Sequence, residues 1–318
     1  MADMVFSGVT FSGGYTIQLP PPSYKAIFGY GQSQAGAFVS MTNLVSNTGV
    51  VATDTTGVGT GRLALAAAGY GTDKAIFGYG LSSGSVYQSV TNLVSNTGIV
   101  ASDTTGVGTA RQGPAAATYG GDKALFGYGS TSVIALSVTN LVSTTGVVAA
   151  DTTGVGTARQ YLAATGYGTD KAIFGYGADY DFTRMSTTNL VSNTGVVAAN
   201  TTGVGTVRAS LAAAGYGTDK AIFGYGSNGS ISATYSLTNL VSNTGVVATD
   251  TTGVGTARAG PAAAMYGSSG QALFGYGETN VGTKLSITNL VSNTGVVASD
   301  TTGVGTARYL LAASNYSI

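Results

Sequence analysis

The sequence predicts an all-β fold: a six-bladed β-propeller of four-stranded blades, closed by the C-terminal strand pairing into the first blade. The first observation is a repeat. Phe-Gly-Tyr-Gly recurs every 48 to 51 residues, a period typical of propellers and other repeat folds. The second is that each copy divides into four short strand-like segments separated by glycine-containing turns. The third is that the chain ends in the one segment that its first repeat lacks.

Residues 1–24 precede the repeats and are predicted to form an N-terminal extended arm. Apolar residues such as Val5, Phe11 and Ile17 are spread through small polar ones, and a run of three prolines forms a stiff spacer. The same pattern also fits an extra outer strand on the first blade. The propeller is expected to cover residues 25–318, with repeats starting at about 25, 74, 123, 171, 220 and 271.

The second repeat illustrates the predicted strands. Its first three strands cover Ala75–Gly80, Ser89–Ser95 and Ile99–Thr104, and Asn-Thr-Gly at 96–98 makes a tight turn because Asn and Gly tolerate positive φ. The fourth strand is Ala-rich, with Leu162–Tyr167 as a clear copy. Strong helix formers are scarce and Gly and Thr interrupt every window, so we expect no helices.

The ends of the chain favour a closed ring. The first repeat opens at Lys25–Gly31 without a preceding Ala-rich strand, and the chain ends in such a strand at Arg308–Tyr316. An open solenoid would need polar caps at both ends. The Ala-rich strand suits the innermost position, since large side chains would collide where the sheets converge. The motif tyrosines are expected to pack between blades: Tyr30, Tyr79, Tyr128, Tyr176, Tyr225 and Tyr276.

Composition excludes several classes of function. Thirteen basic and thirteen acidic residues cancel, so a nucleic-acid partner, which needs clustered Lys and Arg, is not expected. The chain has no Cys and no His, which removes disulfides, thiol chemistry, most zinc and copper sites and the commonest general base. The N-terminus lacks the basic region of a secretory signal, and no apolar run reaches membrane-spanning length. We expect no cofactor, no metal and no membrane insertion.

The repeat resembles the kelch repeat. The resemblance rests on an Arg, then Leu or Pro with three small residues, a Gly-Asp turn, and an apolar strand ending in Gly-Tyr-Gly, and it covers 25–318. It implies a propeller that binds proteins. Gly29-Tyr30-Gly31 and its copies stand where kelch blades have two glycines, and the chain has no Trp. The repeat of the regulator of chromosome condensation is a weaker resemblance. The near-identical copies and the apolar leader are also similar to repeat proteins of tailed-phage virions.

Each repeat carries an acid before its Gly-Val-Gly loop and an Arg after it. We interpret each pair as an ion pair or hydrogen bond that fixes the loop; the alternative is a ring of carboxylates that binds metal or acts as acid and base. Asn200 replaces the acid opposite Arg208. The pairs are Asp54 and Arg62, Asp103 and Arg111, Asp151 and Arg159, Asp250 and Arg258, and Asp300 and Arg308.

The positions that differ between copies indicate a recognition surface. The segment after each Phe-Gly-Tyr-Gly varies, and so do the two residues after each Arg. In a four-stranded meander both regions emerge on one face, while the uniform Asn-Thr-Gly and Gly-Thr-Asp turns share the other. Loops on a rigid scaffold commonly carry recognition; relaxed drift is the alternative. Aromatic residues and basic ones are the expected contacts: Tyr87, Tyr161, Tyr180, Phe182, Arg184, Tyr235 and Lys284.

These features predict a non-enzymatic structural and binding protein of a virus particle, such as a phage tail or capsid accessory protein. Residues 1–24 would dock to other virion subunits, and the variable face would bind a host-surface glycan or protein. A cellular kelch-like interaction module is the alternative, followed by a lectin. An enzyme would need an asymmetric acid cluster, and the variable loops offer only Asp179, Asp181 and Glu278.

Overall fold

The computed structural model describes residues 24–229 and 233–317. Within these ranges there is no α-helix, and the single helical turn is η1 (Ser83–Ser85), so the all-β prediction is confirmed. No described helix has the length and hydropathy needed to cross a membrane. The predicted arm lies outside the described residues except for Tyr24, which begins the first strand.

Small antiparallel sheets make up the fold, and most have three strands. Each of six sheets joins an Ala-rich strand, a central strand from the Phe-Gly-Tyr-Gly region and a Thr-Asn-Leu-Val strand. In that order they are β21 (Ala312–Ser317), β1 (Tyr24–Gly29) and β3 (Thr42–Val45); β5 (Ala66–Tyr70), β6 (Lys74–Ser82) and β7 (Val86–Val94); β8 (Ala115–Tyr119), β9 (Lys123–Gly127) and β10 (Thr139–Val142); β11 (Ala163–Tyr167), β12 (Lys171–Gly175) and β13 (Thr188–Val191); β14 (Ala212–Tyr216), β15 (Lys220–Gly224) and β16 (Thr238–Val241); and β17 (Ala262–Tyr266), β18 (Gln271–Glu278) and β19 (Lys284–Val291). The short β4 (Arg62–Leu63) pairs with β6, and β2 (Gln32–Ser33) pairs with β20 (Arg308–Tyr309).

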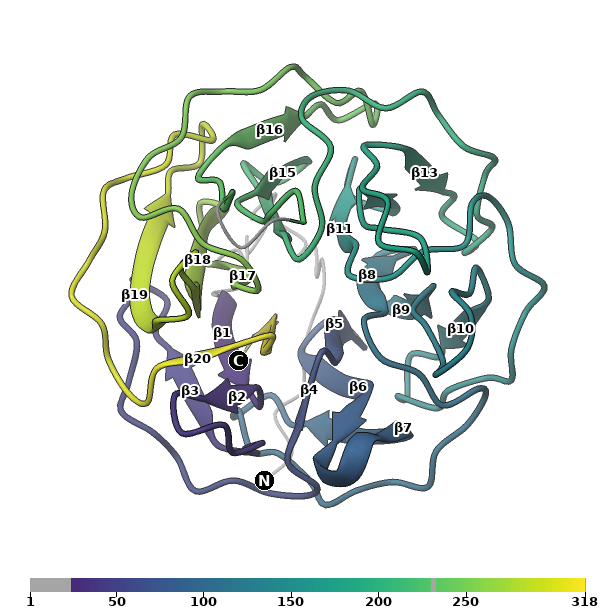
Figure 1. Cartoon of the computed structure of the whole chain (residues 1–318), viewed down its shortest axis with the longest axis horizontal. Helices are drawn as coiled ribbons and strands as arrows, with labels where there is room; N and C mark the ends of the chain where they lie inside the picture. The colour runs from purple at the N-terminus through teal and green to yellow at the C-terminus, as the bar shows by residue number, and fades with distance from the viewer. Residues whose placement is uncertain (1–23, 230–232, 318) are drawn as a thin grey trace, which may run out of the picture.

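The sheets surround a common centre (Figure 1). Each Ala-rich strand contacts the Ala-rich strands of both neighbouring sheets, in the order β5, β8, β11, β14, β17, β21 and back to β5. These strands also line a cavity on the axis. The expectation that the Ala-rich strands are innermost is therefore confirmed.

The C-terminal strand pairs with the first described one. β21 runs antiparallel to β1 from Tyr24↔Ser317 to Gly29↔Ala312, in the same register that β5 has against β6 (Ala66↔Gly78). The end of the chain thus supplies the strand missing from the first repeat, as the sequence indicated.

Two cyclic sets of backbone hydrogen bonds surround the axis, one at each end. At the first end each repeat donates an N–H to the carbonyl of the preceding one over 2.7–2.9 Å, through Ala64, Gly113, Tyr161, Ser210, Gly260, Leu310 and back to Ala64. All six of these residues have positive φ, between 50° and 60°. At the second end the turns are joined by bonds of 2.7–3.1 Å: Gly71 to Asp122, Gly120 to Asp170, Gly168 to Asp219, Gly217 to Gly270, Gly267 to Tyr24 and Ser317 to Asp73.

The predicted third strand of each repeat, Ile99–Thr104 in the second, is reduced to isolated bridges. In the second repeat only Thr91↔Thr104 and Val94↔Val100 pair. Between them the Asn92 side chain, not a backbone N–H, donates to the Ala101 carbonyl over 3.0 Å. Side-chain bonds of this kind compete with a regular ladder, so the four-stranded prediction is wrong in that the outermost segment is an irregular edge.

The motif tyrosines interrupt the central strands. Tyr79 has φ 64° and lies at a register shift between Gly78 and Gly80, which marks a β-bulge. The bulge turns its fully buried ring onto Phe126 of the next sheet, with centroids 5.0 Å apart. The other five motif tyrosines have the same positive φ and make the same contact with a neighbouring sheet. Their predicted role in packing between repeats is confirmed.

Candidate functional site

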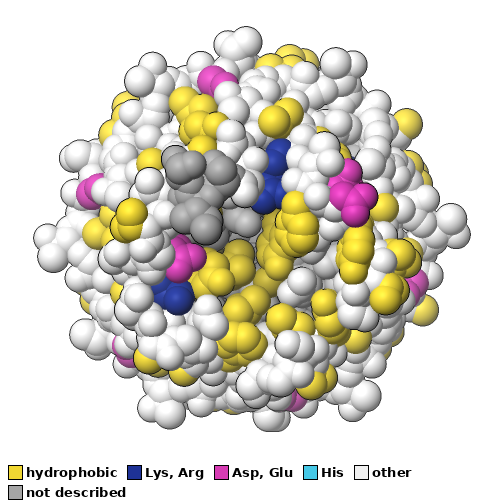
Figure 2. Space-filling model, in the orientation of Figure 1, with side chains coloured by type: hydrophobic (Ala, Val, Ile, Leu, Met, Phe, Trp, Pro, Cys, Tyr) yellow, Lys and Arg dark blue, Asp and Glu magenta, His cyan; other side chains and the backbone are white. Residues whose placement is uncertain are grey.

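Backbone pairing brings the two variable regions of the sequence together. The residues after each Arg pair with the variable segment after Phe-Gly-Tyr-Gly, as in Leu63↔Leu81 and Gln160↔Ala178. The predicted neighbourhood of the two regions is therefore confirmed, and we call this surface the variable face. It carries β2, β4 and β20 and is turned towards the viewer in Figure 2, where hydrophobic side chains gather around a central hollow and charged ones are few.

Variable loops from neighbouring repeats contact one another. The Tyr180 hydroxyl donates to the Ser132 carbonyl over 2.6 Å. The Arg184 guanidinium lies against Gly229, where an added Cβ would be 3.2 Å from it. Gln34 accepts from the Lys284 N–H over 2.7 Å. Since these partners come from different repeats and are not repeated in the other copies, the loops are held as one asymmetric surface.

An aromatic group lies near the axis on this face. Tyr161 belongs to the cyclic hydrogen-bond set, and burial raises its pKa to about 12, with smaller electrostatic effects of Tyr309, Tyr87 and Arg184. Two other predicted contact residues, Tyr87 and Arg184, thus act on Tyr161 electrostatically. Tyr309 was missed as an individual residue, although it lies in the variable pair that follows Arg308.

Lys284 lies beside the same group. Its side chain is 8% exposed, 3.9 Å from the Glu278 carboxylate, and its Nζ is 4.9 Å from the centre of the Tyr309 ring. A lysine this buried is held by its acid and by the ring face. It is therefore a component of the surface's architecture as well as a charged group.

The remaining predicted contacts differ in accessibility. Phe182 is 56% exposed and has φ 61°, and Tyr180 is 41% exposed. Tyr235 is half-buried, and its backbone carbonyl accepts the Arg258 backbone N–H over 3.3 Å. Phe182 and Tyr180 can meet a partner directly, whereas Tyr235 supports the chain around Arg258.

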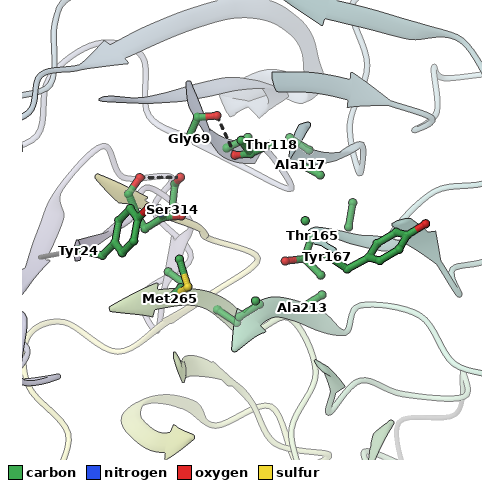
Figure 3. A pocket seen from close by; sticks show the side chains of 18 of the residues that line it. Tyr24, Gly69, Ala117, Thr118, Thr165, Tyr167, Ala213, Met265 and Ser314 are labelled. Carbon is green, nitrogen blue, oxygen red and sulfur yellow. Dashed lines mark hydrogen bonds between the residues drawn. The ribbon is translucent and has the colours of Figure 1, made fainter. Parts of the chain in front are cut away.

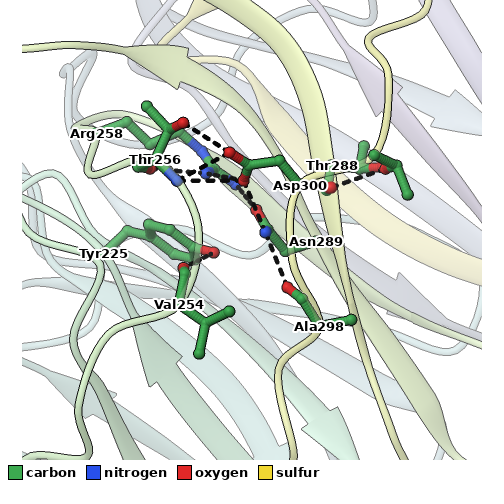
Figure 4. Close-up of polar contacts among 9 residues, drawn as sticks. Tyr225, Val254, Thr256, Arg258, Thr288, Asn289, Ala298 and Asp300 are labelled. Carbon is green, nitrogen blue, oxygen red and sulfur yellow. Dashed lines mark hydrogen bonds and ion pairs between the residues drawn. The ribbon is translucent and has the colours of Figure 1, made fainter.

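The Asp and Arg residues form clusters between repeats, which corrects the predicted pairing within each repeat. We call the contact region between two neighbouring repeats a seam. At the seam between the fifth and sixth repeats, Arg258 follows the loop of the fifth and donates to Asn289 of the sixth over 2.7 Å (Figure 4). Asn289 donates to Asp300 over 2.8 Å, and Asp300 accepts from the Thr256 N–H and hydroxyl over 3.0 and 2.6 Å. The Arg258 and Asp300 charges are 3.9 Å apart. The acid of each repeat thus clasps the loop of the preceding one.

The arginines in these clusters are fully buried. Arg258 lies 4.0 Å from the centre of the Tyr225 ring, and Tyr225 donates its hydroxyl to Val254 over 3.2 Å. The same arrangement joins Arg62 to Asp103, Arg111 to Asp151, Arg208 to Asp250 and Arg308 to Asp54. These residues hold loops, as predicted.

One seam lacks the acid. Asn200 faces Arg159 and Thr157, because its Oδ1 accepts the Thr157 N–H over 3.1 Å and its Nδ2 donates to the Thr157 hydroxyl over 2.7 Å. The prediction that Asn200 stands opposite Arg208 is therefore wrong by one repeat; Arg208 has Asp250.

The axial cavity is a feature that the sequence reasoning did not single out. It measures about 220 Å³, and its lining includes the second and fourth residues of every Ala-rich strand (Figure 3). The second residue is Ala in all copies, but the fourth varies. Aligning the six copies would have shown that this position differs among otherwise similar strands. Its residues are Gly69, Thr118, Gly166, Gly215, Met265 and Asn315. Among the described residues no group of three or more acids forms a metal-binding cluster.

The chain matches no known family model and no curated protein. The likeness to kelch repeats and to virion proteins of tailed phages therefore stays a prediction from the sequence.

Proposed function

We propose that the chain is a closed six-bladed β-propeller that acts as a non-enzymatic structural and recognition protein of a particle such as a virion. Closure is supported by the pairing of β21 with β1, by the two cyclic hydrogen-bond sets and by the Arg308–Asp54 contact. A ring that leaves only short, irregular outer edges suits a protein that must persist outside a cell without disulfides.

The observation that carries the recognition role is the locking of variable loops across repeats. Drifting loops would have no reason to acquire matched contacts such as Tyr180 with Ser132 or Gln34 with Lys284. A surface fixed before binding loses less conformational entropy when a partner docks. The loops combine Tyr, Ser, Gly and Asn with a few large anchors, a composition that also serves antibody paratopes.

The exposed tips of these loops favour a protein partner over a glycan. Val133, Ile134 and Val281 are 67%, 52% and 78% exposed, and Phe182 is 56% exposed. Aliphatic side chains bury against protein surfaces at interface cores. Residues 1–24 would attach the ring to its assembly, as the sequence predicts.

The test has two stages. Mass spectrometry of purified particles should recover this chain in fixed proportion to other particle proteins; recovery only from host cytosol would leave a cellular interaction module instead. Adsorption of the purified chain to host cells should then saturate and fall at least about tenfold with Phe182→Ala and Tyr180→Ala, since interface aromatics are common hot spots. The matched control is Thr48→Ala, in a turn of the uniform face. Equal losses in the control would contradict recognition through the variable face.

A further inference from the structure

We propose that the axial cavity is a binding site for a monosaccharide-sized polyol that bears one anionic group. This inference is independent of recognition through the variable face. It rests on the apolar layer at one end of the cavity, the backbone groups of its wall and the lysines at its mouth.

Towards the variable face the cavity gives way to an apolar layer. Beyond its Ala layer lies a second, smaller hollow of about 60 Å³, which is lined by Leu65, Pro114, Leu162, Leu211, Pro261 and Leu311 and by the cyclic hydrogen-bond set that contains Ala64 and Tyr161. At the opposite end the lining reaches turn residues such as Thr72, Thr169 and Thr218. The polar groups of a ligand are therefore expected on the side of the uniform face, and its apolar part next to the Leu and Pro layer.

The wall presents backbone hydrogen-bonding groups. In an antiparallel pair, alternate residues turn their N–H and C=O away from the partner strand. The Gly69 carbonyl accepts the Thr118 hydroxyl over 2.8 Å across the gap between two Ala-rich strands, which identifies the second and fourth residues as the set that faces the cavity (Figure 3). Small side chains leave these donors and acceptors within reach. A ligand with several hydroxyl groups satisfies both kinds, whereas a purely apolar ligand would strip them of water.

Three lysines lie at the mouth. Lys74, Lys171 and Lys220 line it together with a single acid, Asp219. Each ammonium is already bonded to the Asp that precedes it, over 2.6–2.8 Å, but an ammonium has three N–H donors. The remaining donors suit a phosphate or carboxylate at the mouth while the hydroxyls reach inward.

The asymmetry of the cavity fits one bound orientation. Thr118, Met265 and Asn315 project from three strands, and three glycines stand at the same position of the others. Gly166 and Gly215 are adjacent in the ring and leave the space next to them open. The Met265 thioether and the Ala methyl groups can cover the apolar face of a sugar ring.

The full chain should be titrated by calorimetry with four probes: glucose 6-phosphate, glucuronate, glucose and inorganic phosphate. We expect one or both anionic sugars to bind, and glucose and phosphate to bind at least about tenfold more weakly, since each lacks one of the two recognised features. Preference for glucose 6-phosphate assigns a phosphorylated ligand, and preference for glucuronate a carboxylated one. Failure of both, or equal binding of glucose or of phosphate alone, would overturn the proposal.

Three variants locate the binding. Gly215→Met fills the cavity with a side chain that the fold already carries at Met265, and should abolish binding. Lys171→Gln should weaken it about fivefold or more. Lys123→Gln is the control, because Lys123 occupies the same repeat position and has the same Asp partner but does not line the cavity. Unchanged binding in both Gly215→Met and Lys171→Gln, or an equal loss in Lys123→Gln, would place any binding elsewhere.

Discussion

Arg308 Nη1 lies 3.6 Å from Asp54 Oδ1, which joins the end of the chain to its first repeat. The four other Arg–Asp contacts measure 3.7–3.9 Å and join consecutive repeats. The seam between the chain ends is therefore built from the same side chains, at the same separation, as the seams within the chain.

The seam at Asn200 should be the one that a single substitution can strengthen. Asn200→Asp would give the buried Arg159 a carboxylate that accepts from the Thr157 N–H and hydroxyl, as Asp151 accepts from Thr109. We expect the free energy of unfolding to rise by about 1 kcal/mol, measured by urea denaturation. The matched Asp151→Asn should lower it by a similar amount; stabilisation by both changes would contradict the clasp.

Two glycines of one sheet should respond to alanine in opposite ways. A Cβ on Gly224 would lie 2.7 Å from Phe274 Cζ in the next sheet, whereas a Cβ on Gly215 meets nothing closer than 3.7 Å. Gly224→Ala should cost about 1–3 kcal/mol of unfolding free energy through overpacking. Gly215→Ala should be neutral or slightly stabilising. Thermal unfolding of the two variants tests the contrast, and equal melting temperatures would argue against this seam.

Acid should weaken five seams together. Burial disfavours the charged form of Asp103, but hydrogen bonds from Thr60 and Asn92 and the charge of Arg62 outweigh it, so its pKa lies below the ordinary value. The same holds for Asp54, Asp151, Asp250 and Asp300. A depressed folded pKa gives stability that is complete above the unfolded value, about 3.9, and is lost as the pH falls through the folded one. Urea midpoints should drop below about pH 4, and less steeply in a variant with all five acids changed to Asn.

Alkali should weaken the packing between sheets. Burial raises the pKa of Tyr30, Tyr79 and Tyr276 to about 12, against the opposing charge of a neighbouring Arg. A raised folded pKa means that stability is complete below the ordinary value near 10 and is lost as the pH rises towards 12. Tyrosinate absorbance should therefore rise in two phases, the second coinciding with loss of the β-sheet circular dichroism signal. A single phase with the fold intact would show that the rings are accessible.

A circular permutant should fold like the parent. Lys25 and Tyr316 are directly opposite each other in β1 and β21, as Lys74 and Tyr70 are at the turn between β5 and β6. A Gly-Thr-Asp link from Tyr316 to Lys25, with new termini at Lys74 and Tyr70, moves the break by one repeat. The melting temperature should stay within a few degrees of that of a linear chain of residues 24–318; failure to fold would show that the chain ends are special.

The sequence predicted most of the repeat and little of its contacts. Periodicity located the strands, the Ala-rich edge and the two faces, because each depends on spacing within one copy. The partner of Asp103 could not be found in this way, since Arg111 is much the nearer arginine in the sequence and only the packing of neighbouring repeats brings Arg62 to 3.7 Å from it. The axial cavity was missed because its wall is backbone and methyl groups, which carry no chemical motif; only the differences at Thr118 and Met265 marked it.

The cyclic hydrogen bonds around the axis carry no information about how many members they join. Each of Ala64, Gly113, Tyr161, Ser210, Gly260 and Leu310 contacts only its two neighbours, with nearly the same backbone geometry. In the proposed ring the number of members would therefore depend on the angle that one sheet makes with the next. Unequal recombination between such similar coding repeats would produce chains with one unit more or fewer, whose ends would still match chemically. Whether such a chain closes would depend on how far the angle between neighbouring sheets can change. The same recombination would also change which variable loops are neighbours.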